Sequence, residues 1–337
     1  MTTPPFFASP GSTIAIFDIG TNATRFGVYT LTGDGWTRRH KDHAFCELGR
    51  LSSDGYLRSD GIQATTAALR RFCQIARNPE YNVRGVAAVA TDALRRAQDG
   101  PDFIQKIKTD LGLSIELIDG QTEARLGALG VTSMVSNAHG LVVDLGGGSL
   151  QLTRVENGIV HDGISLPLGV QRLTTEGNNC GIFIESALRD AVSTDRSPTP
   201  YLYVIGGSLR SLGRLYQLRS GAPHSALVDD IVMAPAMVKR MTEWMNNSPE
   251  TAIKEIADPN NHNIHFDRAK FLPVAGLVLS ALIDTFDPQE IHVSSAGIRD
   301  GLLQEIKNGE RPLSPVPAPS GPSGHMPPPA TPPQPTT

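Results

Sequence analysis

Two short glycine-rich segments contain the residues best suited to phosphate chemistry. DIGTN (18–22) and DLGGGS (144–149) each follow an apolar run and place an aspartate just before a turn of small residues. Glycines in such turns can adopt positive φ and bring backbone N–H groups close to a ligand. N–H groups that converge on one point bind phosphate oxygens. Each segment alone is a weak signal, but the pair predicts two phosphate-binding turns.

The side chains beside these turns add hydrogen-bond donors and candidate metal ligands. Asp18 and Asp144 would repel a bound phosphate unless a cation lay between them, so both are candidate Mg²⁺ ligands. The alternative is that the two aspartates only form Asx turns. Neither segment matches a Walker loop or a dinucleotide-binding fingerprint, which disfavours two common phosphate-binding folds. The candidate phosphate-binding residues in the turns are Gly20, Thr21, Asn22, Gly146, Gly147, Gly148 and Ser149.

The elements that must position these turns follow one plan, which occurs twice. IAIFDIGTNATRFGVYTL (14–31) and LVVDLGGGSLQLTRV (141–155) each contain a buried strand, a turn that begins at Asp-x-Gly, and a second, alternating strand. The repeat predicts two related halves whose turns face each other across a cleft. The alternative is that Asp-Gly is simply common in hairpin turns.

Apolar β-rich runs alternate with helical periodicity along the folded region, which is typical of an α/β protein. The predicted strands are 13–18, 25–31, 83–90, 141–144, 150–155, 201–205 and 290–293. The predicted helices are 61–76, 101–111, 122–135, 208–218, 228–246, 268–285 and 298–307.

Length and composition limit the class of protein. A chain of 337 residues predicts two domains. The net charge of -4 disfavours a general nucleic-acid coat or a basic membrane patch. We see no signal peptide and no apolar run long enough to span a bilayer, so we expect a cytoplasmic protein without nucleic-acid or membrane partners. A homodimer is compatible with the sequence.

The expected organisation has four parts. Residues 1–11 are predicted to be disordered, 12–135 to form domain I with the first turn, and 136–310 to form domain II with the second. The last helix of domain II is free to pack back on domain I. Residues 311–337 contain 11 of the 25 prolines and one charged residue, so we predict a disordered tail.

Seven ordered segments resemble the exopolyphosphatase / guanosine pentaphosphate phosphatase family of the actin-like, sugar-kinase and Hsp70 superfamily. They are DIGTNATRF (18–26), VATDALRRA (89–97), IDGQTEARLGALGV (118–131), VVDLGGGSLQL (142–152), SLPLGVQRL (165–173), VIGGSLRSLGRL (204–215) and SAGIRDGLL (295–303). The resemblance implies two ribonuclease-H-like domains with a cleft between them. It also implies Mg²⁺-dependent hydrolysis of inorganic polyphosphate or of guanosine pentaphosphate (pppGpp).

The resemblance also implies roles for individual residues. Glu123 matches the family's catalytic base, and Asp144 matches its Mg²⁺-binding aspartate. Arg95 matches a position that contacts phosphate, and Arg299 matches an arginine near the cleft. Arg25, which directly follows the first turn, adds a further phosphate clamp because its guanidinium matches phosphate geometry.

Two departures from the family pattern concern charge. The glutamate of the family's D-x-G-G-G-S-x-E is Gln151 here, which keeps a carbonyl oxygen for a metal or water but loses a charge. Glu47 stands where an arginine is usual, and Arg50 partly compensates. Two other functions therefore stay open: a phosphotransferase or ATPase of the same superfamily, and a regulator that binds polyphosphate or guanosine polyphosphates with weak or no catalysis.

Overall fold

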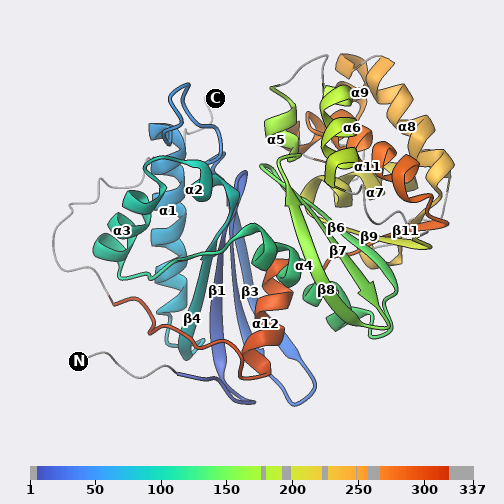
Figure 1. Cartoon of the computed structure of the whole chain (residues 1–337). Coiled ribbons are helices and arrows are strands. Elements are labelled where there is room, and N and C mark those ends of the chain that lie inside the picture. Colours follow the sequence, from blue (N-terminus) through green and yellow to red (C-terminus); the bar gives the residue numbers. More distant parts are fainter. Residues whose placement is uncertain are drawn as a thin grey trace, which may run out of the picture.

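The structure is a computed structural model, and it describes residues 6–175, 180–191, 199–221, 227–247, 249–256, 264 and 266–318. Figure 1 shows two β-sheets side by side, each with helices on its outer side. This arrangement confirms the predicted α/β class with two similar halves. No helix in the described ranges is long and apolar enough to cross a membrane.

The first sheet has the strand order β3-β2-β1-β4-β5, and the second has the order β10-β11-β9-β6-β7-β8. In each sheet three successive antiparallel strands are followed by parallel strands that return through helices. The first sheet consists of β1 (Thr13–Ile19), β2 (Ala23–Leu31), β3 (Trp36–Phe45), β4 (Val83–Ala90) and β5 (Glu116–Leu117). The second consists of β6 (Gly140–Leu145), β7 (Leu150–Glu156), β8 (Ile159–Leu166), β9 (Tyr201–Ile205), β10 (Val232–Met233) and β11 (Glu290–Val293).

The helices divide into an outer and an inner group. The outer helices of the first sheet are α1 (Ser59–Ala76), α2 (Asp92–Arg96) and α3 (Gly100–Leu111). The outer helices of the second sheet include α5 (Val170–Leu173), α6 (Cys180–Ala191), α7 (Gly207–Ser220), α8 (Pro235–Asn247), α9 (Pro249–Ile256), α10 (Phe266–Ala269) and α11 (Leu272–Phe286). The inner helices, α4 (Gly120–Met134) and α12 (Ile298–Lys307), lie between the sheets.

Each inner helix packs on the sheet of the other predicted domain. Leu302, Leu303 and Ile306 of α12 pack in one buried cluster with Ile14 and Ile16 of the first sheet. Complete burial of such side chains stabilises the fold by about 1.5–3 kcal/mol each. The helix that ends the second predicted domain therefore packs on the first sheet, as the sequence allowed.

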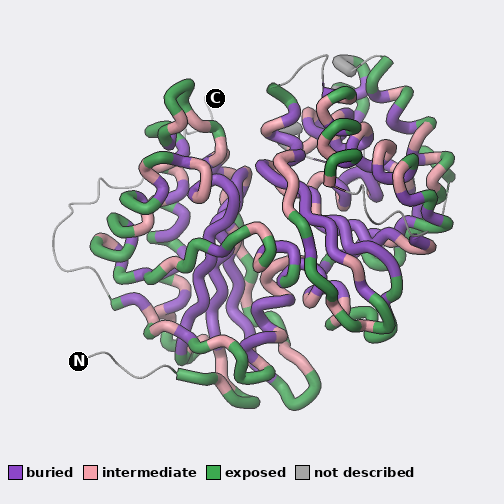
Figure 2. The backbone as a smooth tube through the Cα atoms, viewed as in Figure 1, coloured by how far each residue is buried: buried purple, intermediate pink, exposed green. Residues whose placement is uncertain are grey.

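Helix α4 covers the inner face of the second sheet, although it belongs to the first predicted domain. Its residues Ala128 and Val131 pack with Val142, Tyr203 and Ile205. The buried tubes of both sheets run on either side of α4 and α12 in Figure 2. The segment that joins the two halves is therefore part of the shared core.

Most predicted elements are present, and the differences have local causes. The sequence WTRRHKDHAF forms β3, which was not predicted because this partly exposed edge strand is mostly polar and lacks apolar alternation. The predicted helix 228–246 begins only at Pro235, because proline is favoured in the first helical turn and breaks a longer helix. A short 3₁₀ turn (Val228–Asp230) and β10 precede it.

Parts of both terminal segments are ordered, contrary to the prediction of disorder. Leu313 pairs with Phe6, and Ser314 pairs with Val86 of β4, so the chain before and after the two domains adds to the first sheet. Arg311 donates a hydrogen bond to Glu305 of α12 over 2.6 Å, which holds the segment after α12 in place. The prolines of this segment are compatible with isolated β-bridges, because each bridge requires few backbone N–H donors and proline has none. Residues 1–5 and 319–337 lie outside the described residues.

Candidate phosphate-binding site

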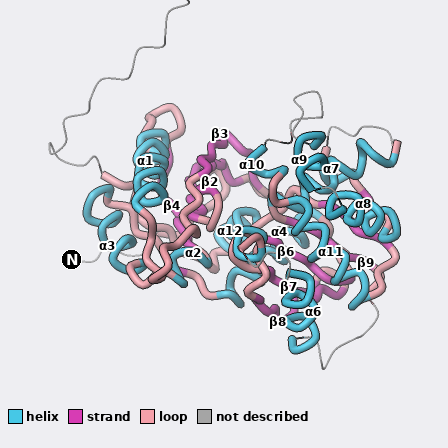
Figure 3. The backbone as a smooth tube through the Cα atoms, turned by 90° about the horizontal axis from the view of Figure 1, so that it is seen from above, coloured by secondary structure: helices cyan, strands magenta, loops and turns pink. Residues whose placement is uncertain are grey.

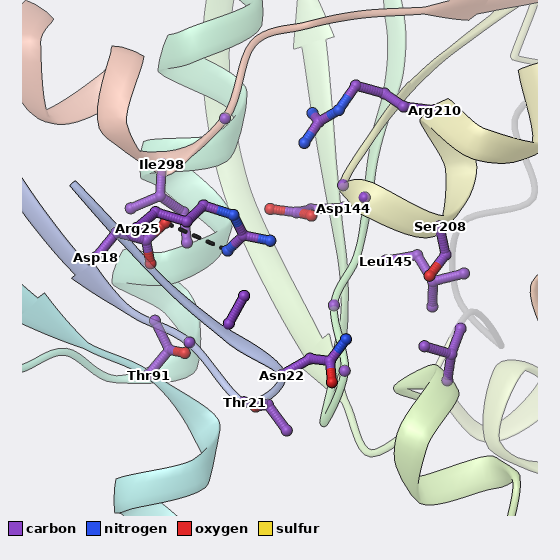
Figure 4. Close-up of a pocket in the computed structure, with 18 of the residues that line it drawn as sticks. Asp18, Thr21, Asn22, Arg25, Thr91, Asp144, Leu145, Ser208, Arg210 and Ile298 are labelled. Carbon is purple, nitrogen blue, oxygen red and sulfur yellow. Dashed lines mark hydrogen bonds and ion pairs between the residues drawn. The ribbon is translucent and has the colours of Figure 1, made fainter. Parts of the chain in front are cut away.

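A cavity of about 110 Å³ lies where the turns of the β1–β2 and β6–β7 hairpins meet, between the sheets (Figure 4). Most of the predicted site residues line it, although they come from four separate stretches of the chain. The structure brings together Asp18, Gly20, Thr21, Asn22, Arg25, Glu123, Asp144, Gly146, Gly147, Gly148, Ser149 and Arg299.

The two turns have the same backbone geometry. The N–H of Gly20 donates to the carbonyl of Ala23 over 3.2 Å, and the N–H of Gly146 donates to the carbonyl of Ser149 over 2.9 Å. Each hairpin also opposes its aspartate to the second residue after the turn, Asp18 to Arg25 and Asp144 to Gln151. The sequence repeat is therefore a structural repeat.

Both turns are anchored through their carbonyl groups. The carbonyl of Thr21 accepts from Gly49, that of Asn22 accepts from the next loop, and the carbonyl of Gly147 accepts from the first turn of α5. The N–H groups of Thr21, Asn22, Gly147 and Gly148 donate to no acceptor in the described parts of the chain. Buried N–H groups normally have hydrogen-bond partners. These four N–H groups are therefore suited to bind an anionic ligand.

The glycines are required by close approach rather than by positive φ. The prediction of positive φ is wrong for Gly20 and for Gly146 to Gly148, since the positive-φ glycines lie elsewhere. A Cβ atom on Gly148 would lie 1.8 Å from Asp92 Oδ2, and one on Gly147 would lie 3.1 Å from Thr21 Cβ. The two turns therefore face and touch each other, as the sequence predicted.

The two aspartates differ in their partners. Asp18 is buried and forms an ion pair with Arg25 over 3.4 Å. Asp144 forms no ion pair and accepts no hydrogen bond from the described residues, and Figure 4 shows its carboxylate between Arg25 and Arg210. Burial raises the pKa of Asp144 to about 6, against the opposing influence of these two arginines. Asp144 thus offers a free carboxylate to the cavity.

Glu123 lies in the first turn of α4, where the free N–H groups of the helix favour a negative charge. The carboxylate of Asp119 caps this helix by accepting from the N–H of Thr122 over 2.7 Å. Glu123 is 5% exposed, and burial raises its pKa to about 8 despite the guanidinium of Arg95 nearby. Arg95 Nη2 lies 2.8 Å from Glu123 Oε2, so an ion pair with Arg95 holds the buried carboxylate.

The position of Asp144 relative to Glu123 is set by Gly127, one turn further along the same face of α4. A Cβ atom on Gly127 would lie 3.5 Å from Asp144 Oδ2, so a larger residue would crowd the carboxylate. The small residue allows β6 and α4 to pack closely. Both carboxylates consequently line one cavity.

Two predicted site residues do not line the cavity. Arg95 pairs with Glu123 and donates to the carbonyl of Ile118 over 2.8 Å, so it holds the predicted base. Gln151 is buried beside Asp144 and donates from Nε2 to Ser149 Oγ (2.7 Å) and Ser165 Oγ (3.0 Å). Its Oε1 has no hydrogen-bond partner among the described residues.

Sequence reasoning missed two arginines of the cavity wall. Arg210 follows the GGS turn of 206–208, and its Nη1 donates to the carbonyl of Ala296 over 3.3 Å. Burial together with Arg25 and Arg268 lowers the pKa of Arg210 to about 10. Arg268 lies over the ring of Phe45, 5.5 Å from its centroid. The third glycine turn was a signal for Arg210, whereas nothing local in the sequence indicated Arg268.

The carboxylates of the cavity suit a metal ion that is held by only one or two protein ligands. No group of three or more His, Cys, Asp and Glu side chains suited to a metal ion occurs within the described ranges. Mg²⁺ is commonly held by one or two carboxylates together with waters and substrate phosphates. The unpaired carboxylate of Asp144 meets that requirement, while Asp18 is already neutralised by Arg25.

Two sheets that share one arrangement of five strands, to which the second sheet adds the antiparallel edge strand β10, have opposed glycine turns between them. They define a two-domain protein of the actin-like fold whose cleft is suited to phosphate. The model of the Ppx/GppA phosphatase family matches residues 40–309, which is most of the chain. The protein therefore belongs to the Ppx/GppA phosphatase family.

Solved structures and a curated relative agree with this assignment. An exopolyphosphatase from Cytophaga hutchinsonii superposes with a TM-score of 0.77 at 20% identity, over 89% of this chain and 99% of that one. The Ppx/GppA family member from Aquifex aeolicus gives a TM-score of 0.72 at 24% identity, over 88% and 97%. Retrograde regulation protein 2 of Saccharomyces cerevisiae is 28% identical over 281 residues, or 73% of this chain. This chain spans only 46% of that relative's length.

Proposed function

We propose that this protein is an exopolyphosphatase, which hydrolyses the terminal phosphoanhydride bond of inorganic polyphosphate and releases orthophosphate. One observation carries the proposal: N–H groups of two opposed turns that donate to no described residue line the same cavity as a buried glutamate, Glu123, which an ion pair with Arg95 holds in place. Free donors suit phosphoryl oxygens, and a positioned buried carboxylate suits a water molecule. Family membership and the structural likeness to an exopolyphosphatase support the same reaction class.

In the proposed reaction the terminal phosphoryl group lies between the turns. The N–H groups of Thr21, Asn22, Gly147 and Gly148 bind its oxygens, and Arg25 and Arg299 add positive charge. Glu123 accepts the proton of the attacking water. A bond forms between the water oxygen and the terminal phosphorus, and the bond to the bridging oxygen breaks, so that the shortened polyphosphate leaves.

Asp144 is the residue that would hold the divalent metal. Enzymes of this family generally depend on such a metal. Bound there, the cation would neutralise the phosphoryl oxygens that would otherwise be repelled by Asp144 and Glu123. We propose that Gln151 keeps Ser149 oriented and acts on the metal only through this contact and its position beside Asp144.

Phosphate release from paired substrates tests the function. The full chain is incubated separately with polyphosphate, pppGpp and ATP, each with and without Mg²⁺. We expect Mg²⁺-dependent release of orthophosphate from polyphosphate. Faster release from pppGpp would favour the pppGpp phosphohydrolase, and ADP formation that needs an acceptor would favour a phosphotransferase.

A regulator is the second candidate, because Gln151 removes a charge beside Asp144 and a curated relative is named as a regulation protein. Tight binding of polyphosphate or pppGpp without phosphate release at any Mg²⁺ concentration would favour it. Such a result would overturn the exopolyphosphatase proposal while leaving the binding site intact.

A further inference from the structure

The edge strand β3 carries three basic side chains on the face of the first sheet that is turned toward the second sheet. In the register, His43 lies opposite Arg25, and Lys41 lies opposite Gly27. Directly opposed residues of antiparallel strands share a face, so both lie on the same face as the cavity residue Arg25. We refer to Arg38, Lys41 and His43 as the β3 row.

A β-bulge brings Arg38 into this row. The pairing shifts between Val28 and Tyr29, so that Tyr29 lies opposite Arg38 and Arg39 is the extra residue. The ring of Tyr29 lies 2.6 Å from where a Cβ atom of Gly27 would be, which places it on this face. Without the bulge, strict alternation would turn Arg38 to the other face.

Charge on an edge strand usually serves to prevent edge-to-edge pairing. That explanation suits the other face, where Asp42 accepts two hydrogen bonds from Arg71 of α1, over 3.0 and 3.1 Å. The β3 row differs, because Arg38 and Lys41 are exposed and pair with no carboxylate in the described part of the chain. Two unpaired cations on one face, Arg38 and Lys41, indicate a ligand of opposite charge, and the imidazole of His43 adds a polar group to the same row.

The row continues the positive wall of the cavity. Lys41 shares its face of the sheet with Arg25, and Arg25, Arg210 and Arg299 all line the cavity. Arg299 Nη1 is buried and has no hydrogen-bond partner among the described residues. Figure 3 shows β3 of the first half beside α10 of the second half, and α10 carries Arg268. Basic groups from both halves therefore lie on the β3 side of the cavity.

A neighbouring cavity is lined by groups that are already paired. This second cavity of about 270 Å³ shares Asn22 and Phe45 with the first, and its wall includes Glu47, Arg50 and Asp60. Glu47 pairs with Arg50 over 2.9 Å and with Lys270 of the other half over 3.0 Å, and Asp60 pairs with Arg58 over 3.1 Å. A polyanion that left by this route would have to displace these ion pairs, whereas the basic side chains of the β3 row are not paired with described carboxylates.

We propose that the β3 row binds the part of a linear polyphosphate chain that extends beyond the cavity. The inference rests on the proposed function, and it assigns the row to the inner phosphates rather than to the reacting one. From His43 to Arg38 the strand covers at most about 17 Å, long enough for several phosphate units. The row therefore acts on long chains, and a short chain held within the cavity does not reach it.

The test removes two charges from the row and compares chain lengths. The double variant Arg38→Gln/Lys41→Gln is assayed with tripolyphosphate and with chains of several tens of phosphates. We expect the KM for the long chain to rise about tenfold, because two charge-assisted contacts are lost. The kcat and the KM for tripolyphosphate should not change. Lys41→Arg should restore the affinity lost in Lys41→Gln.

The matched control is Arg70→Gln/Arg84→Gln, which removes the same charge from exposed positions on α1 and β4. It should leave the KM for long chains unchanged. Equal losses in the two double variants, equal losses on the two chain lengths, or an unchanged KM in the row variant would each overturn the inference.

Binding measurements separate this inference from the proposed function. The same chains are titrated onto Glu123→Gln with and without the row substitutions, so that no turnover is needed. Tighter binding of long chains that depends on the row supports the inference even if the protein releases no phosphate. Phosphate release with chain-length-independent binding would retain the function and overturn the inference, as would the absence of any binding of long chains.

Discussion

The β1–β2 and β6–β7 hairpins share a backbone and differ in charge. Both turns close with the same hydrogen bond, and both present N–H groups to one cavity. In the first hairpin Arg25 neutralises Asp18, whereas in the second the equivalent position is Gln151 and Asp144 stays unpaired. A single change of residue type thus separates a turn whose aspartate is paired from one whose aspartate pairs with no described residue, and the proposed function assigns the cation to the second turn.

The hairpins also differ in how closely other elements approach them. Asp92, held by Arg96 over 2.7 Å, packs against Gly148 in the second turn. For a Cβ atom on Gly20 in the first turn, the nearest atoms would be the Ala23 carbonyl oxygen at 3.0 Å and Arg25 Nη1 at 3.4 Å. Gly148 is therefore more closely packed than Gly20.

Glu123 belongs to neither hairpin, and its loss should remove the reaction that both serve. Glu123→Gln should lower kcat by about 10²–10⁴-fold, the usual contribution of a general base. Orthophosphate release measures the effect, and retained polyphosphate binding serves as the control. Full turnover in this variant would exclude Glu123 as the base.

The two aspartates provide the most direct test of the comparison. Asp144→Asn should lower kcat by about 10²–10³-fold, because it removes a cavity-lining carboxylate that pairs with no described residue and is therefore available to a metal. Asp18→Asn should cost only about tenfold, because Arg25 already neutralises that carboxylate. Activity is measured over a range of Mg²⁺ concentrations. A larger loss for Asp18→Asn would reverse the roles assigned to the two hairpins.

The pKa of Glu123 predicts how activity depends on pH. A base must be deprotonated, so kcat/KM should rise with pH to a midpoint near 8, about tenfold for each unit below it. Because the pKa is raised from 4.5, this group's contribution to stability is full below pH 4.5 and is lost as the pH rises to about 8. Denaturation of Glu123→Gln across this range should lack that loss. An identical slope in both proteins would contradict the assignment.

The packing of the second turn predicts a loss of stability. Gly148→Ala places a methyl group against Asp92 and should cost about 1–3 kcal/mol in the free energy of unfolding, measured with urea. Gly146→Ala should cost less, since its Cβ atom would lie 3.3 Å from the Ser149 carbonyl. Adding Asp92→Ala to Gly148→Ala should recover part of the loss. No recovery would place the strain elsewhere.

Gln151→Glu should have the smallest effect and would sharpen the contrast between the hairpins. A second carboxylate beside Asp144 should lower the Mg²⁺ concentration for half-maximal activity several-fold, since added ligand charge strengthens hard-cation binding. The Mg²⁺ titration of phosphate release measures this. A matched change on the first hairpin, Arg25→Gln, should raise KM and leave the Mg²⁺ requirement nearly unchanged.

Much of the site was predictable because its residues lie in recognisable local patterns. Asp18 and Asp144 end apolar strands before glycine turns, and Glu123 begins an amphipathic helix after a capping aspartate. Arg268 was not predictable, because it enters the cavity from a helical turn far along the chain with no motif of its own. The β3 row was also missed, because an exposed edge strand lacks the apolar alternation that identifies a strand.

The sequence by itself determined the repeated hairpin and the aspartate, glycine and glutamate positions, because turn chemistry and strand periodicity act over a few residues. Only the tertiary structure decided that Arg95 holds Glu123, that Asp144 pairs with none of the described residues and that the glycines are needed for close approach. These properties depend on which side chains from distant segments meet, and on how burial changes their charge. The local sequence specifies neither the contacts between distant segments nor the effect of burial on charge.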